Sequence, residues 1–173
     1  LAYIGEAVRG ELNPLKYNIP EAEAIATVWG GIAWTEEDAS LTNFKEEANH
    51  YQLLHLATHA ILDDRDPTFS YLTFAPSTAS LANNKLFIRD LYNLNLPTKM
   101  VVLSACETGI GKLQRGEGII SLARAFAYAG ANSIITTLWQ VSDQRSAELV
   151  TAFYQFLAEG KTKDMALWQA KNQ

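Results

Sequence analysis

The sequence predicts an α/β domain with a mainly parallel sheet and helices on both of its faces. Three short apolar segments, at 51–57, 99–103 and 133–139, have the composition of buried strands. Segments with the 3.6-residue apolar spacing of helices alternate with them along the chain. Because parallel neighbours need right-handed crossover connections, this alternation indicates one sheet that is covered on both sides.

The composition is that of a single globular domain. Of the 173 residues, 48% are hydrophobic, which is enough for a core of ordinary size. The sequence shows no internal repeat and supports no second domain. A formal net charge of −5 argues against a surface that binds nucleic acid. No segment approaches the roughly 18 consecutive apolar residues of a membrane span, so we expect no membrane contact.

The cysteine content limits the chemistry. A single cysteine excludes an internal disulfide and a multi-thiolate zinc site. We therefore expect no metal, no cofactor and a reducing, cytoplasmic setting. The chain opens at Leu1 without a methionine or a signal peptide, so we also expect it to be a piece of a longer protein.

Glycine and proline positions divide the first 50 residues into short elements. Residues 1–5 predict a short strand broken by glycine, and 32–35 predict another. Pro20 is favourable in the first turn of a helix that Gly30 ends. The expected inward stripe of this helix consists of Ile25, Val28 and Trp29.

A second helix is predicted over 41–48, capped by Ser40 or Thr42. Its expected inward residues are Leu41 and Phe44.

The middle of the chain predicts less regular structure. A charged loop is expected over 61–68, and weak alternation over 69–74 favours an edge strand. Residues 76–84 predict a long turn, and 89–93 a short helix.

The last third predicts a loop, two long helices and a final helix. A glycine-rich loop over 107–116 leads into a helix at 117–129. Ser142 caps a helix over 143–159, and Thr162 opens the last one. The apolar positions expected to face inward are Ile119, Ile120, Leu122, Ala123, Phe126 and Ala127 in the first helix, and Leu149, Val150, Phe153 and Phe156 in the second.

Two of the predicted core strands end in reactive side chains, His59 and Cys106. If the strands are parallel neighbours, both ends open into the same crevice, where ligands bind in open α/β sheets. A neighbouring imidazole stabilises a thiolate and can later protonate a leaving amine. His50 and His55 are poorer candidates, because one precedes the strand and the other lies within it.

A purely structural role is the alternative for each residue of this pair. A cysteine that ends a core strand is usually a small buried residue, and a histidine after a strand is usually held by hydrogen bonds. Position alone therefore does not decide whether the two residues are catalytic or only packed in the core.

Two phosphate-binding loops are excluded by their residues. A P-loop needs a glycine where Cys106 stands and a hydroxyl residue where Leu113 stands. A cysteine phosphatase loop has arginine six residues after its cysteine, and that position is Lys112.

The chain resembles the CHAT domain, a bacterial family of caspase-like and separase-like peptidases that is often fused to tetratricopeptide repeats. His59 lies 47 residues before Cys106, close to the spacing of about 50 in the caspase signature. The segments that carry the resemblance run in the family's order and are 54–59, 101–109, 116–118, 125–131 and 138–143.

The resemblance implies a caspase-like three-layer α/β/α sandwich and a cysteine endopeptidase that acts on protein or peptide substrates. His59 matches the catalytic histidine and Cys106 the nucleophile. Backbone N–H groups of Ala60 and Cys106 would stabilise the oxyanion. The resemblance also implies a possible tetratricopeptide-repeat region in the same full-length chain.

Three features depart from the family pattern. Ala60 stands where the family usually has glycine, so a methyl group would point near the oxyanion site. The turn at 83–84 carries two asparagines where glycine is common. The family's domain also starts earlier and ends with a further strand, so we expect residues 1–173 to be one domain that is truncated at both ends.

The resemblance to separases also implies a specificity pocket for a basic side chain. Asp143 is the first candidate for its acid, Glu107 is the second, and Trp139 forms either the pocket wall or part of the core. For Asp143 a structural role is a strong alternative, since a carboxylate at a helix start is favourable in any case.

An alternative of a different class is a non-catalytic interaction or regulatory module that keeps the histidine and cysteine as core residues. A redox-sensing cysteine ranks last, because the chain has no second cysteine to resolve an oxidised one.

Overall fold

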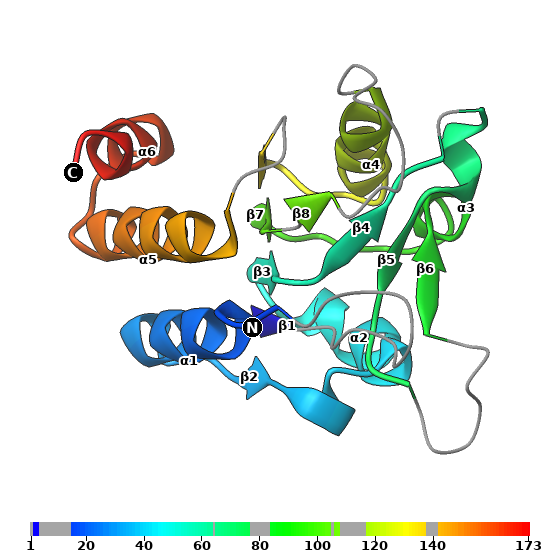
Figure 1. Cartoon of the computed structure of the whole chain (residues 1–173), viewed down its shortest axis with the longest axis horizontal. Helices are drawn as coiled ribbons and strands as arrows, with labels where there is room; N and C mark the ends of the chain where they lie inside the picture. Colours follow the sequence, from blue (N-terminus) through cyan, green and yellow to red (C-terminus); the bar gives the residue numbers. More distant parts are fainter. Residues whose placement is uncertain are drawn as a thin grey trace.

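The computed structural model describes residues 2–3, 15–63, 65–76, 84–104, 106–107, 117–137 and 142–173. Two sheets form the middle of the molecule, and helices lie on either side of the larger one (Figure 1). This arrangement confirms the prediction of an α/β fold with a parallel sheet.

The larger sheet is parallel throughout, with the strand order β2-β1-β3-β7-β9. Its strands are β1 (Ala2–Tyr3), β2 (Ala33–Trp34), β3 (Leu53–Leu56), β7 (Met100–Leu103) and β9 (Ile134–Thr136). β3 and β7 are central and nearly fully buried, as their apolar composition predicts. In contrast, β9 ends the described sheet, and its residues are only half-buried, so the expectation of a third core strand was wrong in this respect.

A second, four-stranded sheet has the order β6-β5-β4-β8. Its strands are β4 (His59–Ile61), β5 (Tyr71–Thr73), β6 (Lys85–Phe87) and β8 (Cys106–Glu107). β4 and β8 are parallel, whereas β5 is antiparallel to both β4 and β6. The predicted edge strand over 69–74 is therefore an inner strand, because β6 covers its outer side. Most of the predicted turn at 76–84 and of the loop at 107–116 lies outside the described residues.

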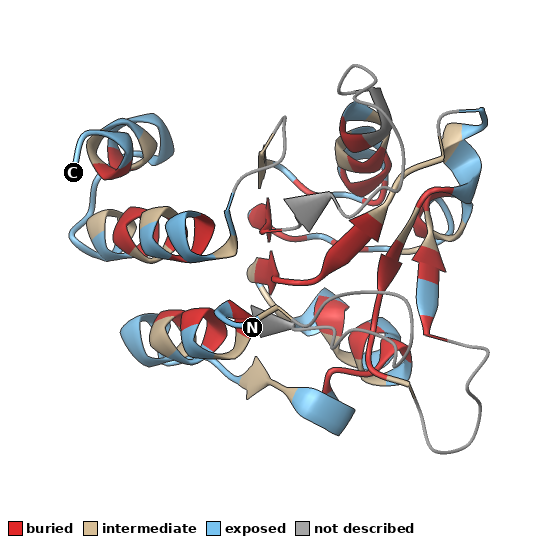
Figure 2. Cartoon of the chain, viewed as in Figure 1, coloured by how far each residue is buried: buried red, intermediate tan, exposed pale blue. Residues whose placement is uncertain are grey.

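Alternate residues of the central strands face two separate cores. Leu54, Leu56, Val101 and Leu103 belong to one apolar cluster, and Met100 and Val102 belong to the other. This is the two-residue period of a strand that is covered on both faces. Figure 2 shows the buried residues gathered on these strands and on the helix faces next to them.

Within the described part of the chain, helices form a layer on each side. The first layer consists of α1 (Asn18–Trp29), α5 (Asp143–Ala158) and α6 (Lys163–Lys171). The second consists of α2 (Leu41–Glu47), α3 (Ile88–Leu91) and α4 (Glu117–Tyr128). Single 3-10 turns lie at Glu36–Asp38, Ala48–His50 and Pro67–Phe69.

The helix boundaries follow local capping chemistry. Ser40 Oγ accepts a hydrogen bond from Asn43 N at 3.2 Å, and Ser142 Oγ accepts one from Arg145 N at 3.3 Å. Gly30 ends α1 in the left-handed conformation with φ 60°. At Gly130 the need for glycine is also steric, because a Cβ there would lie 3.0 Å from the carbonyl oxygen of Leu96.

Several predicted inward residues are exposed. Val28 and Trp29 are 38% and 41% exposed, and Trp29 borders a cavity. The buried face of α1 consists of Asn18, Glu21, Ala22 and Ile25. In α4 Ile120 is 40% exposed, and Ala127 is also exposed. Leu41, Phe44, Val150 and Phe153 are buried as predicted.

No helix within the described ranges is both long and apolar enough to cross a membrane.

A buried polar cluster lies between the sheet and the α1–α5 layer. It consists of Glu21 in α1, His55 in β3 and Tyr154 in α5, all at most 3% exposed. His55 Nε2 and Glu21 Oε1 are 3.0 Å apart, and the rings of His55 and Tyr154 meet edge to face at 5.6 Å. Burial above all, and then the Glu21 carboxylate, raises the pKa of Tyr154 well above its ordinary value.

This pKa shift predicts a loss of stability in alkali that depends on Tyr154. Because the phenol ionises only after unfolding, the unfolded state loses a proton above about pH 10 that the folded state keeps. Stability is therefore complete below pH 10 and falls above it. Between pH 9 and 11, we expect the free energy of unfolding to fall less steeply in Tyr154→Phe than in the native protein. The difference in slope is up to about 1.4 kcal/mol per pH unit, measured by urea unfolding. Tyr128→Phe, at a position that is 73% exposed, is the matched control and should leave the slope unchanged. Equal slopes for native protein and Tyr154→Phe would contradict the shift.

Candidate active site

His59 and Cys106 occupy directly opposite positions of a parallel ladder. Their Cα atoms are register partners in the pairing of β4 with β8. Leu56 and Leu103 are partners in the pairing of β3 with β7, with the same offset of 47 residues along the chain. The ladder of the larger sheet thus continues in unchanged register into the smaller one, which confirms that the two predicted strands are parallel neighbours.

The chain bends at Thr58, between β3 and β4, and the register is kept across this bend. Ser104 N donates a hydrogen bond to Leu56 O at 2.9 Å, which carries the ladder one step past β7. On the other side Thr58 Oγ1 donates to Thr73 O at 2.6 Å. Thr73 Oγ1 in turn lies 3.4 Å from His59 O, so β5 holds the histidine backbone.

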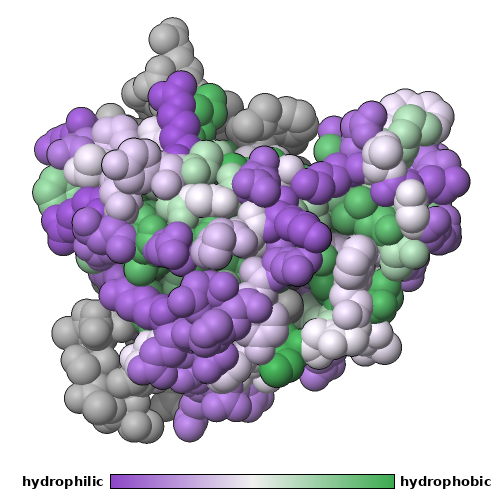
Figure 3. All heavy atoms as spheres, turned by 180° about the vertical axis from the view of Figure 1, so that it is seen from behind, coloured by the Kyte–Doolittle hydropathy of each residue, from purple (hydrophilic) through white to green (hydrophobic). Residues whose placement is uncertain are grey.

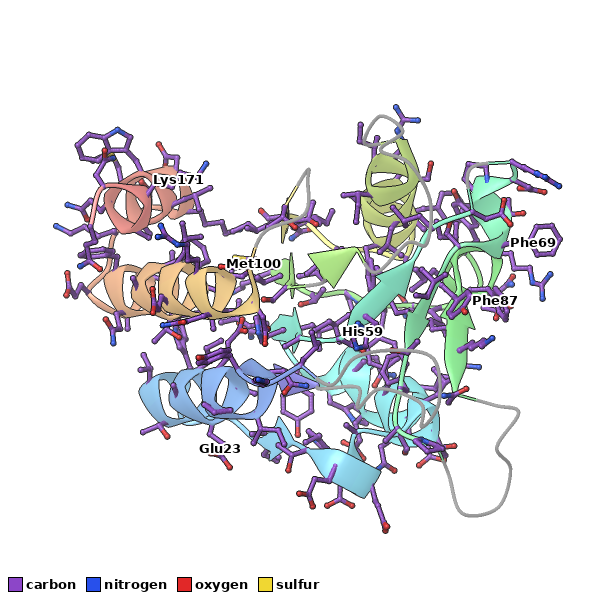
Figure 4. The ribbon with its side chains drawn as sticks, in the orientation of Figure 1. Glu23, His59, Phe69, Phe87, Met100 and Lys171 are labelled. Carbon is purple, nitrogen blue, oxygen red and sulfur yellow. The ribbon has the colours of Figure 1, made fainter. Side chains whose placement is uncertain are left out.

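The imidazole of His59 is fully enclosed, with 0% of the residue exposed. Figure 4 shows it in the interior of the molecule, on β4. The backbone of Cys106 and Glu107 is described as β8, whereas their side chains lie outside the described part. The structure therefore gives the backbone register of the pair and the burial of its histidine.

The methyl group of Ala60 belongs to the apolar cluster that contains Leu72 and Leu86. β4 is also paired on both sides, with β5 and with β8. The effect of this methyl group on an oxyanion site stays a prediction.

Asp143 is held by the backbone at the start of α1. Its Oδ2 accepts hydrogen bonds from Lys16 N at 2.8 Å and from Tyr17 N at 3.1 Å. As the first residue of α5 it also lies where a carboxylate is favoured by the helix dipole. The structural role is therefore present, and the specificity role stays a prediction. Trp139 lies outside the described residues.

A cavity of about 290 Å³ lies at the carboxyl end of β7, next to the site. It is bordered by Ser104, two residues before Cys106, and by Ser146 of α5, and their hydroxyl oxygens are 3.5 Å apart. Its charged lining residues among those described are Arg145 and Lys171. An apolar or acidic side chain fits such a cavity better than a basic one. Sequence reasoning missed these residues, because α5 and α6 join β7 only in the folded molecule.

A larger cavity of about 680 Å³ lies at the opposite, amino ends of the strands. It is lined by Gln52 and Lys99, which precede β3 and β7, and by Trp29 of α1. In the view from behind, apolar side chains gather on the side formed by α1, α5 and α6 (Figure 3). This cavity is on the wrong side of the sheet ends to serve His59 and Cys106.

The other two histidines face elsewhere. His50 is exposed, with Nδ1 3.4 Å from Glu47 Oε2. His55 pairs with Val102 in the ladder and contacts Glu21. Within the described ranges no group of three or more His, Cys, Asp or Glu residues is placed to hold a metal ion.

The chain thus has a parallel α/β fold in which a histidine lies opposite a cysteine at neighbouring strand ends. The family model for the CHAT domain matches residues 5–173, so the chain belongs to the CHAT domain family. Over 81 residues, 47% of the chain, it is 37% identical to human tetratricopeptide repeat protein 28, and equally so to the mouse protein of that name. The matched stretch is 3% of the length of each relative, so the chain spans a small part of the curated relatives it matches.

Proposed function

We propose that this CHAT domain is a cysteine endopeptidase of the caspase and separase type, with His59 and Cys106 as its catalytic dyad. The observation that carries the proposal is their register pairing across β4 and β8. Paired strands lie about 4.8 Å apart, and directly opposed residues carry side chains that interact. This backbone register supports the proposal that the thiol and the imidazole come within reach of proton transfer.

The mechanism follows from the two side chains. His59 accepts the proton of the Cys106 thiol, and the thiolate attacks the scissile carbonyl carbon. The imidazolium then protonates the amine as the C–N bond breaks, which leaves an acyl-enzyme. Water, deprotonated by His59, attacks this thioester and releases the carboxylic acid and the thiol.

Backbone N–H groups would stabilise the oxyanion of the tetrahedral intermediate. The N–H of Cys106 is the better candidate, because β8 pairs with β4 alone among the described strands. The N–H of Ala60 is the second candidate, because β4 is paired on both sides.

The wider assignment is likewise a proposal. Helices on both faces of a parallel sheet support the caspase-like three-layer sandwich. The name of the relatives supports a tetratricopeptide-repeat region in the full-length chain, which would bring protein or peptide substrates to the domain. We place this reaction in the cytoplasm, where the single cysteine stays reduced.

The enclosure of His59 favours the second candidate function, a non-catalytic interaction module. An imidazole with 0% exposure gives a substrate no access in this conformation. Catalysis therefore requires an opening of the site, whereas a scaffold does not. Labelling of Cys106 by an active-site-directed reagent separates the two functions.

A peptidyl chloromethyl ketone, added to the full-length protein, tests the dyad. We expect one label on Cys106 and none in Cys106→Ala. His59→Ala should slow labelling about a hundredfold or more, the usual contribution of a general base. His50→Ala is the matched control, since His50 is exposed and remote from the ladder. A label that persists in Cys106→Ala, or native protein that is not labelled, would reject the peptidase in favour of the module.

Cleavage profiling of Asp143→Asn tests the preference for a basic residue. The amide keeps the shape of the carboxylate and can still accept a backbone hydrogen bond, so the change removes mainly charge. We expect the preference for arginine or lysine before the cut to fall about tenfold. Glu148→Gln, on the exposed side of the same helix, should keep the native profile. An unchanged profile removes Asp143 from the pocket, and a native preference for acidic residues would point to the cavity with Arg145 and Lys171.

A further inference from the structure

We propose that Glu21, His55 and Tyr154 form a positioning network that holds His59 opposite Cys106. This inference rests on the proposed dyad and concerns residues that do not touch the reacting atoms. The three side chains come from α1, β3 and α5. His55 lies four residues before His59 in the sequence.

The contact between Glu21 and His55 is deeply buried. Their side chains are 2% and 1% exposed, and the carboxylate oxygen lies 3.0 Å from the imidazole nitrogen. Residues around them, such as Ile25, Val102 and Phe153, form an apolar cluster. A pair of this kind adds less stability than apolar residues of equal size, and its best-attested use is to fix register.

Apolar packing alone would leave the lengthwise position of β3 less defined. Side chains such as Val102 make contacts that change little when a strand shifts slightly, because the attraction is non-directional. His55 Nε2 and Glu21 Oε1 lie 3.0 Å apart without a hydrogen bond between them, and separating the partners of a buried pair is costly. His55 thus ties β3 to α1 more strictly than apolar contacts would.

The helices that hold this contact are joined to each other at both ends. Near the start of α1, Lys16 N and Tyr17 N donate to the carboxylate of Asp143 in α5. At its end, Trp29 Nε1 donates to Tyr154 O at 3.3 Å. Tyr154 also places its ring edge to face against His55. The two helices therefore provide a fixed frame for the imidazole.

The ladder transmits the position of His55 to the dyad. His55 pairs with Val102 and His59 pairs with Cys106, at the same offset. Between them Ser104 N bonds to Leu56 O, so the two strands stay joined across the bend. A displacement of β3 would move His59 relative to Cys106, and displacements near 1 Å are enough to slow catalysis strongly.

The double variant Glu21→Leu/His55→Leu tests the network separately from stability. Replacing a buried pair by apolar residues of similar size commonly preserves or raises stability. Since Cys106 is the single cysteine, alkylation by iodoacetamide reports on this thiol alone. We expect a urea midpoint at or above that of the native protein, and alkylation at pH 7 at least tenfold slower. The midpoint of the pH–rate profile should move toward about 8.5, the ordinary cysteine value.

Leu54→Val is the matched control, because Leu54 is fully buried on the same strand and faces the other core. It should lower stability and leave alkylation within twofold of native. A double variant with native stability and native alkylation kinetics would overturn the network. If the double variant does not fold, Glu21→Gln takes its place, with alkylation at least threefold slower expected and a native rate overturning the proposal.

His59→Gln in the same assay distinguishes a failure of the proposed dyad from a failure of the positioning network. If the native thiol reacts no faster than the thiol of His59→Gln, the dyad itself fails. If the native thiol depends on His59 but not on Glu21 and His55, only the positioning network fails.

Discussion

The constraint on which the rest of the structure depends is the uninterrupted register of one parallel ladder. β3 and β7 pair at an offset of 47 residues, and the same offset persists when both chains leave the large sheet as β4 and β8. Register in a buried sheet is strongly specified, because a slip of one residue would turn every side chain to the other face. The same packing that makes the core therefore sets histidine opposite cysteine.

Burial on both faces makes this ladder rigid and also closes the site. The apolar clusters on the two faces pack against helices of both layers, and His59 lies inside with no exposed surface. The packing that holds His59 in place thus also denies a substrate access to it in this conformation.

Local signals in the sequence predicted the parts of the fold that are decided locally. Apolar runs located β3 and β7, and Ser40 and Ser142 marked the starts of their helices. The predicted inward face of α1 was right at Ile25 and wrong at Val28 and Trp29. Trp29 meets Tyr154 and a cavity only after α5 packs. The second sheet was largely missed, since strands of two or three residues have no detectable period. The partner of Glu21 was also unpredictable, because a contact between a helix and a later strand leaves no spacing signal.

The measurement that tests the register most directly is disulfide formation in His59→Cys. Opposed residues of paired strands have Cα atoms about 4.8 Å apart, within the range that a disulfide spans. After refolding in a glutathione buffer, we expect a disulfide between position 59 and Cys106 and no free thiol. Ile61→Cys, two residues further along β4, should keep both thiols free. Free thiols in His59→Cys, or equal cross-linking in Ile61→Cys, would contradict the placement of His59 opposite Cys106.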